Sequence, residues 1–182
     1  MHKLLVAGIA ALLIACAPAT PPTKDEGSAP IAGGSAMLGP EGYGPVRVGM
    51  TVEEAGAALG HALQAEGLSE DPQACQIYPD AGALYMAEQG RITRVSAYQD
   101  IAGAEGIRTA EGVGLGSSDA EVRSAYPGAA EEPAKYEGPP AHDLIAWTTP
   151  NERGIRFEID ASGKVVRMHA GGPSIMYMEG CS

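Results

Sequence analysis

The sequence predicts an α+β fold made of two similar units, each a short helical segment packed on an antiparallel β-meander. Two observations carry this prediction. An apolar strand, a glycine and a helix-capping sequence occur together twice, at residues 46–55 and 113–122. Each copy is followed by a strand, a tight turn and another strand, at residues 84–95 and 157–168. Short helices set among consecutive antiparallel strands are typical of α+β domains.

The chain, 182 residues long, begins with a sequence typical of an export signal. Lys3 gives a short positive start, and residues 4–15 form an almost wholly apolar run. A transmembrane helix needs about 20 apolar residues, so this run is too short to span a bilayer. We therefore expect residues 1–15 to be a signal peptide that is removed.

The apolar run ends in Leu13-Ile14-Ala15-Cys16, which resembles the lipobox of bacterial lipoproteins. In that family a small residue precedes the cysteine that is lipidated and becomes the mature N-terminus. The resemblance implies that Cys16 carries a diacylglycerol on its sulfur and an acyl chain on its nitrogen, and more than one chain gives stable anchoring. Ala17 stands where an Asp tends to retain such proteins in the inner membrane. We therefore expect an outer-membrane, lipid-anchored protein facing the periplasm. The alternative is an ordinary cleaved signal with an incidental cysteine.

The segment that starts at Cys16 is predicted to be a disordered tether spanning residues 16–42. It is rich in Pro, Ala and Gly and poor in bulky apolar side chains, and its prolines disfavour a helix. The folded part is then expected to comprise a first repeat unit at residues 43–105 and a second at residues 106–182.

Each predicted helix starts with a capping box. Thr51 with Glu54, and Ser118 with Glu121, have the S/T-x-x-E spacing. In such a box the hydroxyl accepts a backbone N–H of the first turn, while the Glu reaches back to the N–H of the capping residue. Both helices are therefore expected to start directly after the capping hydroxyl.

The ends of the helices and the turns of the hairpins are also marked. Gly60 can adopt the left-handed conformation that ends a helix, and Pro127 disfavours helix in the residue before it. Residues 88–90 and 160–163 suit hairpin turns, and residues 128–140 are predicted to be a loop.

This layout of two units resembles the tandem fold of the β-lactamase inhibitory protein. A single unit is similar to the small lipoprotein of the outer-membrane β-barrel assembly machine. The resemblance rests on the repeated pattern apolar-Gly-x-[Thr/Ser]-x-x-Glu and covers most of residues 44–178. It implies a fold and no activity, because the pattern is a folding motif. The duplication departs from the assembly lipoprotein, and the lipid anchor departs from the secreted inhibitor.

The net charge of the chain restricts its partners. A formal charge of −11 at pH 7 argues against general electrostatic binding of nucleic acid and against a polybasic membrane patch. We therefore expect no nucleic-acid partner and contact with the membrane only through the N-terminal lipid.

The cysteines predict a disulfide. If Cys16 is lipidated, Cys75 and Cys181 remain as an even pair, which in an oxidising compartment favours a bond. The bond would tie the end of the chain to its first half, closing a loop worth roughly 4–5 kcal/mol in the chain-entropy model. The alternative is a redox or nucleophilic thiol, which the lack of a Cys-x-x-Cys motif disfavours.

Strand alternation predicts one sheet face against the helices and one open face. The open face is predicted to carry Tyr85, Arg94, Tyr98, Arg167 and His169. Tyr and Arg are enriched at the hot spots of protein interfaces, so this face is a candidate binding surface. The alternative is a solvated face with amphipathic side chains.

No motif predicts catalysis, a metal site or a cofactor. Residues 112–116 are rich in glycine but lack the Lys-Ser/Thr of a phosphate-binding loop, so a tight strand-to-helix turn explains them better. His61, His142 and His169 are far apart and lack metal-binding spacing. The serines at 117–118 are better explained as helix caps than as a nucleophile elbow.

These observations lead to three hypotheses about function. The first is a non-catalytic protein-binding module, inhibitor-like or regulator-like, that binds an envelope protein. The second is a role in envelope maintenance, outer-membrane assembly or peptidoglycan binding. The third is a hydrolase, which would need a buried carboxylate or histidine in a deep cleft.

Overall fold

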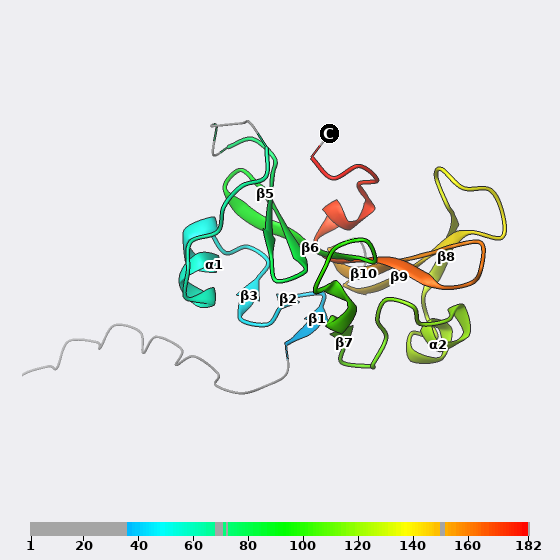
Figure 1. Cartoon of the computed structure of the whole chain (residues 1–182). Helices are drawn as coiled ribbons and strands as arrows, with labels where there is room; N and C mark the ends of the chain where they lie inside the picture. The colour runs from blue at the N-terminus through cyan, green and yellow to red at the C-terminus, as the bar shows by residue number, and fades with distance from the viewer. Residues whose placement is uncertain (1–35, 68–70, 72, 150–151, 182) are drawn as a thin grey trace, which may run out of the picture.

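The computed structural model describes residues 36–67, 71, 73–149 and 152–181. The predicted signal peptide, the lipidation site Cys16 and the predicted tether up to residue 35 lie outside the described residues. Within the described residues the chain is α+β, as predicted, with two short α-helices and two β-sheets (Figure 1). None of the helices in these ranges is long and apolar enough to cross a membrane.

The elements follow the chain in this order: β1 (Met37–Gly39), β2 (Gly42–Tyr43), β3 (Val46–Arg47), α1 (Val52–Leu59), β4 (Gln76–Asp80), β5 (Ala83–Glu88), β6 (Arg91–Tyr98), the 3-10 turn η1 (Ala104–Gly106), β7 (Arg108–Thr109), α2 (Asp119–Ala125), β8 (Ala130–Pro133), β9 (His142–Thr149), β10 (Arg153–Ile159), β11 (Val165–Gly171) and the 3-10 turn η2 (Pro173–Met176).

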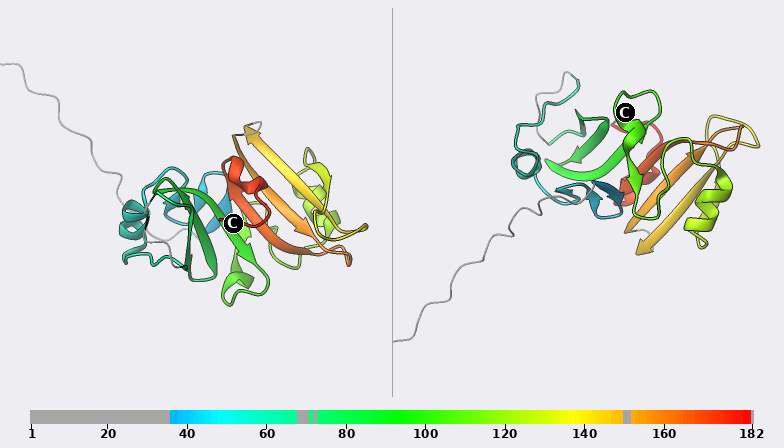
Figure 2. Two further views of the ribbon diagram at one scale, coloured as in Figure 1. Left: turned by 90° about the horizontal axis from the view of Figure 1, so that it is seen from above. Right: turned by 60° about the horizontal axis from the view of Figure 1, so that its bottom comes forward.

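The larger sheet has seven strands in the order β4-β5-β6-β11-β10-β9-β8, and every neighbouring pair is antiparallel. It consists of two meanders, β4–β6 and β8–β11, which meet where β6 pairs with β11 (Figure 2). The smaller sheet has four strands in the order β3-β2-β1-β7, and β1 runs parallel to β7. Both sheets therefore join the first half of the chain to the second.

Both helices begin with the predicted capping box. In α1 the backbone N–H of Glu54 donates to Thr51 Oγ1 at 3.1 Å, and the Glu54 carboxylate accepts from the Thr51 N–H at 2.8 Å. The corresponding distances between Ser118 and Glu121 in α2 are 3.3 and 2.6 Å. α1 ends at Gly60, whose φ is 84°, and α2 ends just before the residue that precedes a proline.

The start of each helix is tied to a β-hairpin of its own half by the same pattern of backbone hydrogen bonds. The bonds, at 2.7–2.9 Å, run from Gly49 N–H to Ile92 O, Ile92 N–H to Met50 O, Gly116 N–H to Val165 O and Val165 N–H to Ser117 O. The two hairpins turn after Glu88 and after Ile159, where the sequence predicts turns. The two halves therefore share both a locally encoded helix start and the same long-range contact with a hairpin strand.

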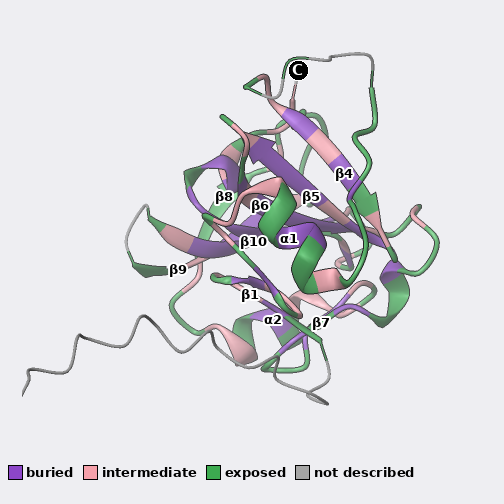
Figure 3. Ribbon diagram, turned by 90° about the vertical axis from the view of Figure 1, so that its left-hand side faces the viewer, coloured by how far each residue is buried: buried purple, intermediate pink, exposed green. Residues whose placement is uncertain are grey.

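One face of the larger sheet forms the hydrophobic core with α1, α2 and the smaller sheet. Its buried side chains include Leu38, Val46, Ala55, Tyr85, Val95, Val122, Phe157 and Met168. In Figure 3, α1 lies in front of the larger sheet and turns its exposed residues outward. Apolar burial of this extent is the dominant stabilising contribution to folding.

The folded part begins earlier than predicted. Leu38 falls in the predicted tether, yet it is 1% exposed and pairs with Tyr43 and Thr109. The short run Met37-Leu38 before Gly39 and Pro40 is too brief to show a strand pattern, so the burial of Leu38 depends on partners distant in sequence. The predicted loop at 128–140 likewise contains β8, whose residues are all exposed and therefore show no alternation.

Candidate functional site

Four of the five residues of the predicted open face lie together on the side of the sheet opposite the core. The register pairs Arg167 with Tyr98 and His169 with Ser96, and it places Arg94 on the same side. However, Arg94 and His169 are each 1% exposed, so neither can contact a partner in this structure. Tyr98 is half-buried, and the side chain of Arg167 is 47% exposed. The predicted face is therefore open only at its Tyr98–Arg167 edge.

The prediction for Tyr85 is wrong. Its register partner is Val95, and its side chain lies in the core at 1% exposure. The apolar character of Leu84 and Met86 suggests that they face the core instead. Met86 is indeed fully buried, but it shares the opposite side of the sheet with Arg94, its register partner. Because this part of the sheet is covered on both sides, apolar alternation does not identify the core side.

The cover over the second face is the C-terminal strap, residues 172–181. Its 3-10 turn η2 packs across β6, β10 and β11. Ile175 in this turn is fully buried, and the Gly172 N–H donates to the Thr93 carbonyl at 2.9 Å. The strap is therefore part of the packed structure rather than a loose end.

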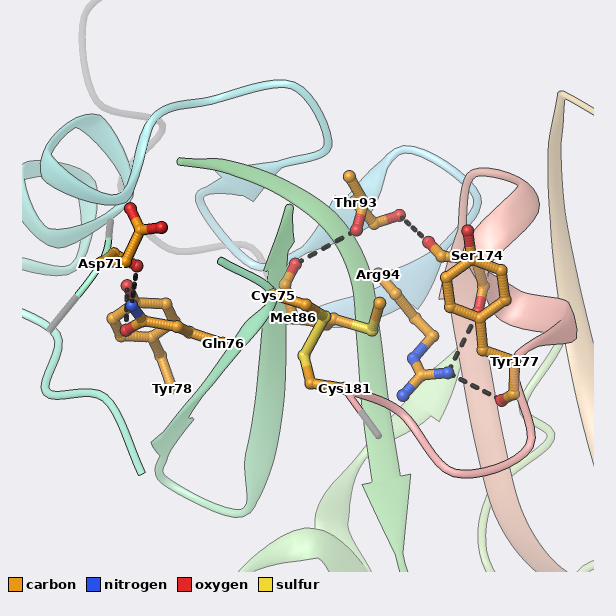
Figure 4. Close-up of a disulfide and its surroundings, with 10 residues drawn as sticks. All are labelled: Asp71, Cys75, Gln76, Tyr78, Met86, Thr93, Arg94, Ser174, Tyr177 and Cys181. Atoms are coloured by element: carbon orange, nitrogen blue, oxygen red, sulfur yellow. Dashed lines mark hydrogen bonds between the residues drawn. A yellow bond between two sulfur atoms is a disulfide. The ribbon is translucent and has the colours of Figure 1, made fainter. Parts of the chain in front are cut away.

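Two buried arginines and a disulfide hold the strap. Arg94 Nη1 donates to the carbonyls of Ser174 and Tyr177, both at 3.0 Å, as Figure 4 shows. Arg156 Nη1 donates to the carbonyl of Ile175 at 3.2 Å. The predicted disulfide is confirmed: Cys75 and Cys181 are bonded, with their Cα atoms 5.2 Å apart (Figure 4). The arginines thus bind three carbonyls of the strap backbone to the sheet, and the Ser174 carbonyl also accepts from the Tyr177 N–H at 3.1 Å.

Gly180 lets the strap pass directly over Arg94. Its φ of 67° lies in the left-handed region, and a Cβ there would come within 3.2 Å of Arg94 Nη2. A larger residue at this position would meet both backbone strain and the guanidinium.

Beneath the strap lies a buried network of charges. Arg156 Nε is 3.0 Å from Asp143 Oδ2, and Arg156 Nη2 is 2.9 Å from the same oxygen and 3.1 Å from Glu158 Oε1. The Nη2 contacts are ionic, because they do not meet the angle of a hydrogen bond. Glu158 Oε2 also accepts from Arg167 Nη1 at 3.1 Å. Charges that are buried in this way need partners of the opposite sign, and the network supplies them.

The network sets the protonation of its members. Burial opposes the ionisation of Glu158, but the hydrogen bond from His169 and the charges of Arg156 and Arg167 lower its pKa to about 2. Burial lowers the pKa of His169 to about 4 despite the nearby carboxylate. Burial raises the pKa of Asp143, although Arg156 acts in the opposite direction. At neutral pH the imidazole is therefore neutral and Glu158 is ionised.

Ser96, His169 and Glu158 have the connectivity of a catalytic triad. Ser96 Oγ lies 2.9 Å from His169 Nδ1, and His169 Nε2 lies 3.0 Å from Glu158 Oε1. A neutral imidazole that donates to the carboxylate leaves its other nitrogen to accept from the serine hydroxyl. Yet Ser96 and His169 are each 1% exposed beneath the strap, so no substrate reaches the hydroxyl in this structure. In this structure the three side chains form a buried polar network. They share one face of the sheet because of the alternation of side chains along β6, β10 and β11.

A groove beside the strap is the accessible part of this face. Its volume is about 560 Å³, and it is lined by Gln99 and Asp100 directly after β6, the loop between β8 and β9, the turn between β10 and β11, and Met178 of the strap. Asp143, Glu158 and Arg167 of the buried network also line it. The Arg167 guanidinium lies 5.2 Å from the centre of the Tyr98 ring. The groove thus adjoins the one edge of the predicted binding face that remains accessible.

One exposed tyrosine lines this groove, and a second lies in the strap next to Met178, which also lines it. Tyr136, which lines it, is 62% exposed, and Tyr177 of the strap is 46% exposed. Lys135 Nζ lies 5.1 Å from the centre of the Tyr136 ring, and the Tyr136 hydroxyl bonds to Glu179 of the strap. Sequence analysis missed both tyrosines, because one lies in a predicted loop and the other follows the last predicted strand.

The other candidate groups have structural roles. Across the described ranges, no three His, Cys, Asp or Glu side chains come together in a way that would hold a metal ion. In the glycine-rich turn, Ser117 Oγ accepts from the Gly114 N–H at 3.1 Å, and Gly116 has a φ of 79°. His142 is 3.0 Å from Asp119 at the start of α2, and His61 is 3.0 Å from Asp80.

No protein-family model matches the chain. No curated protein matches it either. Among solved structures, the chain is similar to an extracellular protein containing an SCP domain from Bacillus anthracis str. Ames, with 11% identity and a TM-score of 0.40. The match covers 69% of this chain and 44% of that protein, so the chain spans less than half of its length. A likeness of this extent identifies neither a family nor a function.

Proposed function

We propose that the chain is a lipid-anchored envelope protein whose folded part is a non-catalytic protein-binding module, inhibitor-like or regulator-like. One observation carries the proposal. Three large hydrophobic side chains are exposed among the described residues, and two of them lie at the strap: Tyr136 lines the groove, and Tyr177 directly precedes Met178, which lines it. Exposed tyrosines beside a groove are typical of the anchors of protein interfaces.

The loops around the groove are held in place, which favours binding without a large loss of entropy. The disulfide and Arg94 fix the strap on one side. On the other side, the Tyr136 hydroxyl contacts Glu179 of the strap. Preorganised loops lose less freedom on association than mobile ones, so more of the contact energy remains for affinity.

The proposed anchoring agrees with the position of β1. A disulfide is typical of proteins in oxidising compartments, which include the bacterial periplasm. β1 packs on the core side of the larger sheet, whereas the strap covers the opposite side. The chain therefore enters the fold at β1 on the side of the larger sheet opposite the strap.

We further propose that the two halves are tandem units of the type found in the β-lactamase inhibitory protein. The identical hydrogen-bond patterns at the two helix starts and the two meanders joined at β6 and β11 support this reading. In such an arrangement the groove lies mostly on the second unit, with Gln99 and Asp100 of the first unit and Met178 of the strap at its border.

Site-specific photocrosslinking in cells tests the binding role. A photoreactive residue in place of Tyr136 should capture one dominant envelope protein, whereas the same residue in place of Glu53 on α1 should not. Capture of barrel-assembly components or cell-wall fragments from position 136 would favour the maintenance role instead. The same set of products from both positions would overturn the assignment of the groove as a binding site.

A further inference from the structure

The groove beside the strap carries an excess of negative charge. Its lining contains the carboxylates Asp100, Glu137, Asp143, Glu158 and Asp160 and the cations Lys135 and Arg167. Both cations are already engaged, because Lys135 lies over the Tyr136 ring and Arg167 contacts Glu158 and the Tyr98 ring. A positively charged group that enters from solvent therefore meets unbalanced carboxylates.

The carboxylates of the groove differ in how far the fold satisfies them. Asp160 accepts from the backbone N–H groups of Ser162 and Lys164 in its own turn, both at 2.9 Å. Glu158 is held by Arg156, Arg167 and His169. Asp100 and Glu137 are exposed at the rim. The rim pair and Asp143 thus remain for a ligand.

Asp143 is the unusual member, because its side chain is only 7% exposed and lies at the base of the groove. Arg156 Nε and Nη2 both contact the same oxygen, Oδ2, and within the described part of the chain no donor is bonded to Oδ1. Arg156 is also shared with Glu158. Asp143 Oδ1 is not among the described polar atoms that are fully buried without a partner, so it is open to the groove, where a positively charged donor can form a charge-assisted hydrogen bond with it.

We propose that the groove binds an arginine or lysine side chain presented by an extended segment of a partner protein, an assignment that rests on the proposed function. The charged end reaches Asp143 Oδ1, and its aliphatic stem lies against Tyr136 and Met178, which line the groove. Asp100 and Glu137 attract the cation at the rim. The volume of about 560 Å³ suits a single long side chain with its flanking backbone.

A peptide titration provides the direct test. The probe is acetyl-Gly-Gly-Arg-Gly-Gly-amide, and its control carries citrulline, a neutral isostere, in place of arginine. In NMR spectra of the full chain, the arginine peptide should shift the backbone amides of the groove saturably, and the citrulline peptide should not. Equal shifts with both peptides, or shifts spread over the whole acidic surface, would overturn the proposal. Free arginine binding as tightly as the peptide would indicate a small-ligand site and reject a peptide segment as occupant.

Charge-matched variants separate the groove from the general acidity of the chain. Asp100→Asn with Glu137→Gln should weaken the arginine peptide by about three- to tenfold, the range expected for two exposed ion pairs. Glu53→Gln with Glu66→Gln changes the net charge equally but lies outside the groove lining, so affinity should be unchanged. Equal weakening by both pairs would overturn the proposal. Asp143→Asn should abolish binding. If that variant does not fold, the double variant Asp100→Asn, Glu137→Gln still tests the proposal.

The two proposals fail in distinguishable ways. A protein that is crosslinked from position 136 with equal yield in the wild type and the rim variant would overturn the cation assignment and leave the binding module intact. Peptide binding without any crosslinked protein in cells would overturn the binding module, and with it the protein partner.

Discussion

Single residues in this fold have roles that their type alone does not reveal. His169 is typical of an exposed, titrating side chain in a strand, yet it lies beneath the strap between Ser96 and Glu158. Tyr85 is a hot-spot residue type, yet it belongs to the core. In both cases the side chain is placed by what covers the strand, and this depends on residues distant in the sequence.

His169 should make stability depend on pH. Its folded pKa of about 4 lies below the ordinary histidine value of about 6.5, so the unfolded chain binds the proton first. Its contribution is therefore complete above pH 6.5 and is lost as the pH falls toward 4. Between pH 7 and pH 5 this single group should reduce the free energy of unfolding by about 2 kcal/mol. Urea unfolding of the wild type and of His169→Gln should show that loss only in the wild type.

His142 provides a control of opposite sign. Burial opposes its charging, but the Pro140 carbonyl and the Asp119 carboxylate raise its pKa. Its contribution is therefore present at low pH and is lost as the pH rises, so His142→Gln should steepen the acid loss of stability. If the free energy of unfolding of His169→Gln falls with pH as it does in the wild type, the protonation of His169 is not the cause of the acid loss of stability.

At the scale of elements, capping boxes and hairpin turns were predictable and the strap was not. Thr51 and Ser118 cap their helices through bonds to residues three positions away, so a short stretch of sequence contains the whole interaction. The strap depends on Arg94, Arg156 and Cys75, which come from distant strands or loops. Strand alternation separates two faces of a sheet but does not tell which face another segment will cover.

Removing the disulfide should loosen the strap first. Replacing Cys75 and Cys181 with serine should destabilise the chain by about 2–5 kcal/mol, since the unfolded chain regains the freedom of a long loop. Hydrogen exchange of amides at residues 172–181 should accelerate more than that of β10 and β11. Thr51→Ala, which should cost about 1 kcal/mol through loss of a helix cap, is the control and should leave strap exchange little changed. If hydrogen exchange of the strap amides is unchanged in the serine variant, the hydrogen bonds from Arg94 and Arg156 are sufficient to hold the strap without the disulfide.

For the whole molecule, the α+β class was predictable because strand and helix signals are local. The groove was not, because it is assembled from the residues after β6, the loop before β9, the turn between β10 and β11, and the strap. Arg167 is the one lining residue that sequence analysis placed on the open face. The loop at residues 134–141 has no hydrophobic periodicity in its sequence, so its conformation beside the groove could not be predicted.

The anchoring proposal also belongs to the whole molecule. The wild-type chain should fractionate with the outer membrane, and Ala17→Asp should shift it to the inner membrane. Cys16→Ser should remove the lipid and release the chain from the outer-membrane fraction. Membrane fractionation measures where each variant is located. Mass spectrometry of the N-terminal peptide shows whether it carries the lipid. A Cys16→Ser chain that remains in the outer-membrane fraction would contradict the lipobox assignment.

The spacing of the disulfide also determines what a cut in the backbone does. Cys181 follows Cys75 by 106 residues, so both meanders and α2 lie between the two cysteines. A single cut at any position between them leaves two fragments that remain covalently joined. The fragments therefore cannot separate until the disulfide is reduced.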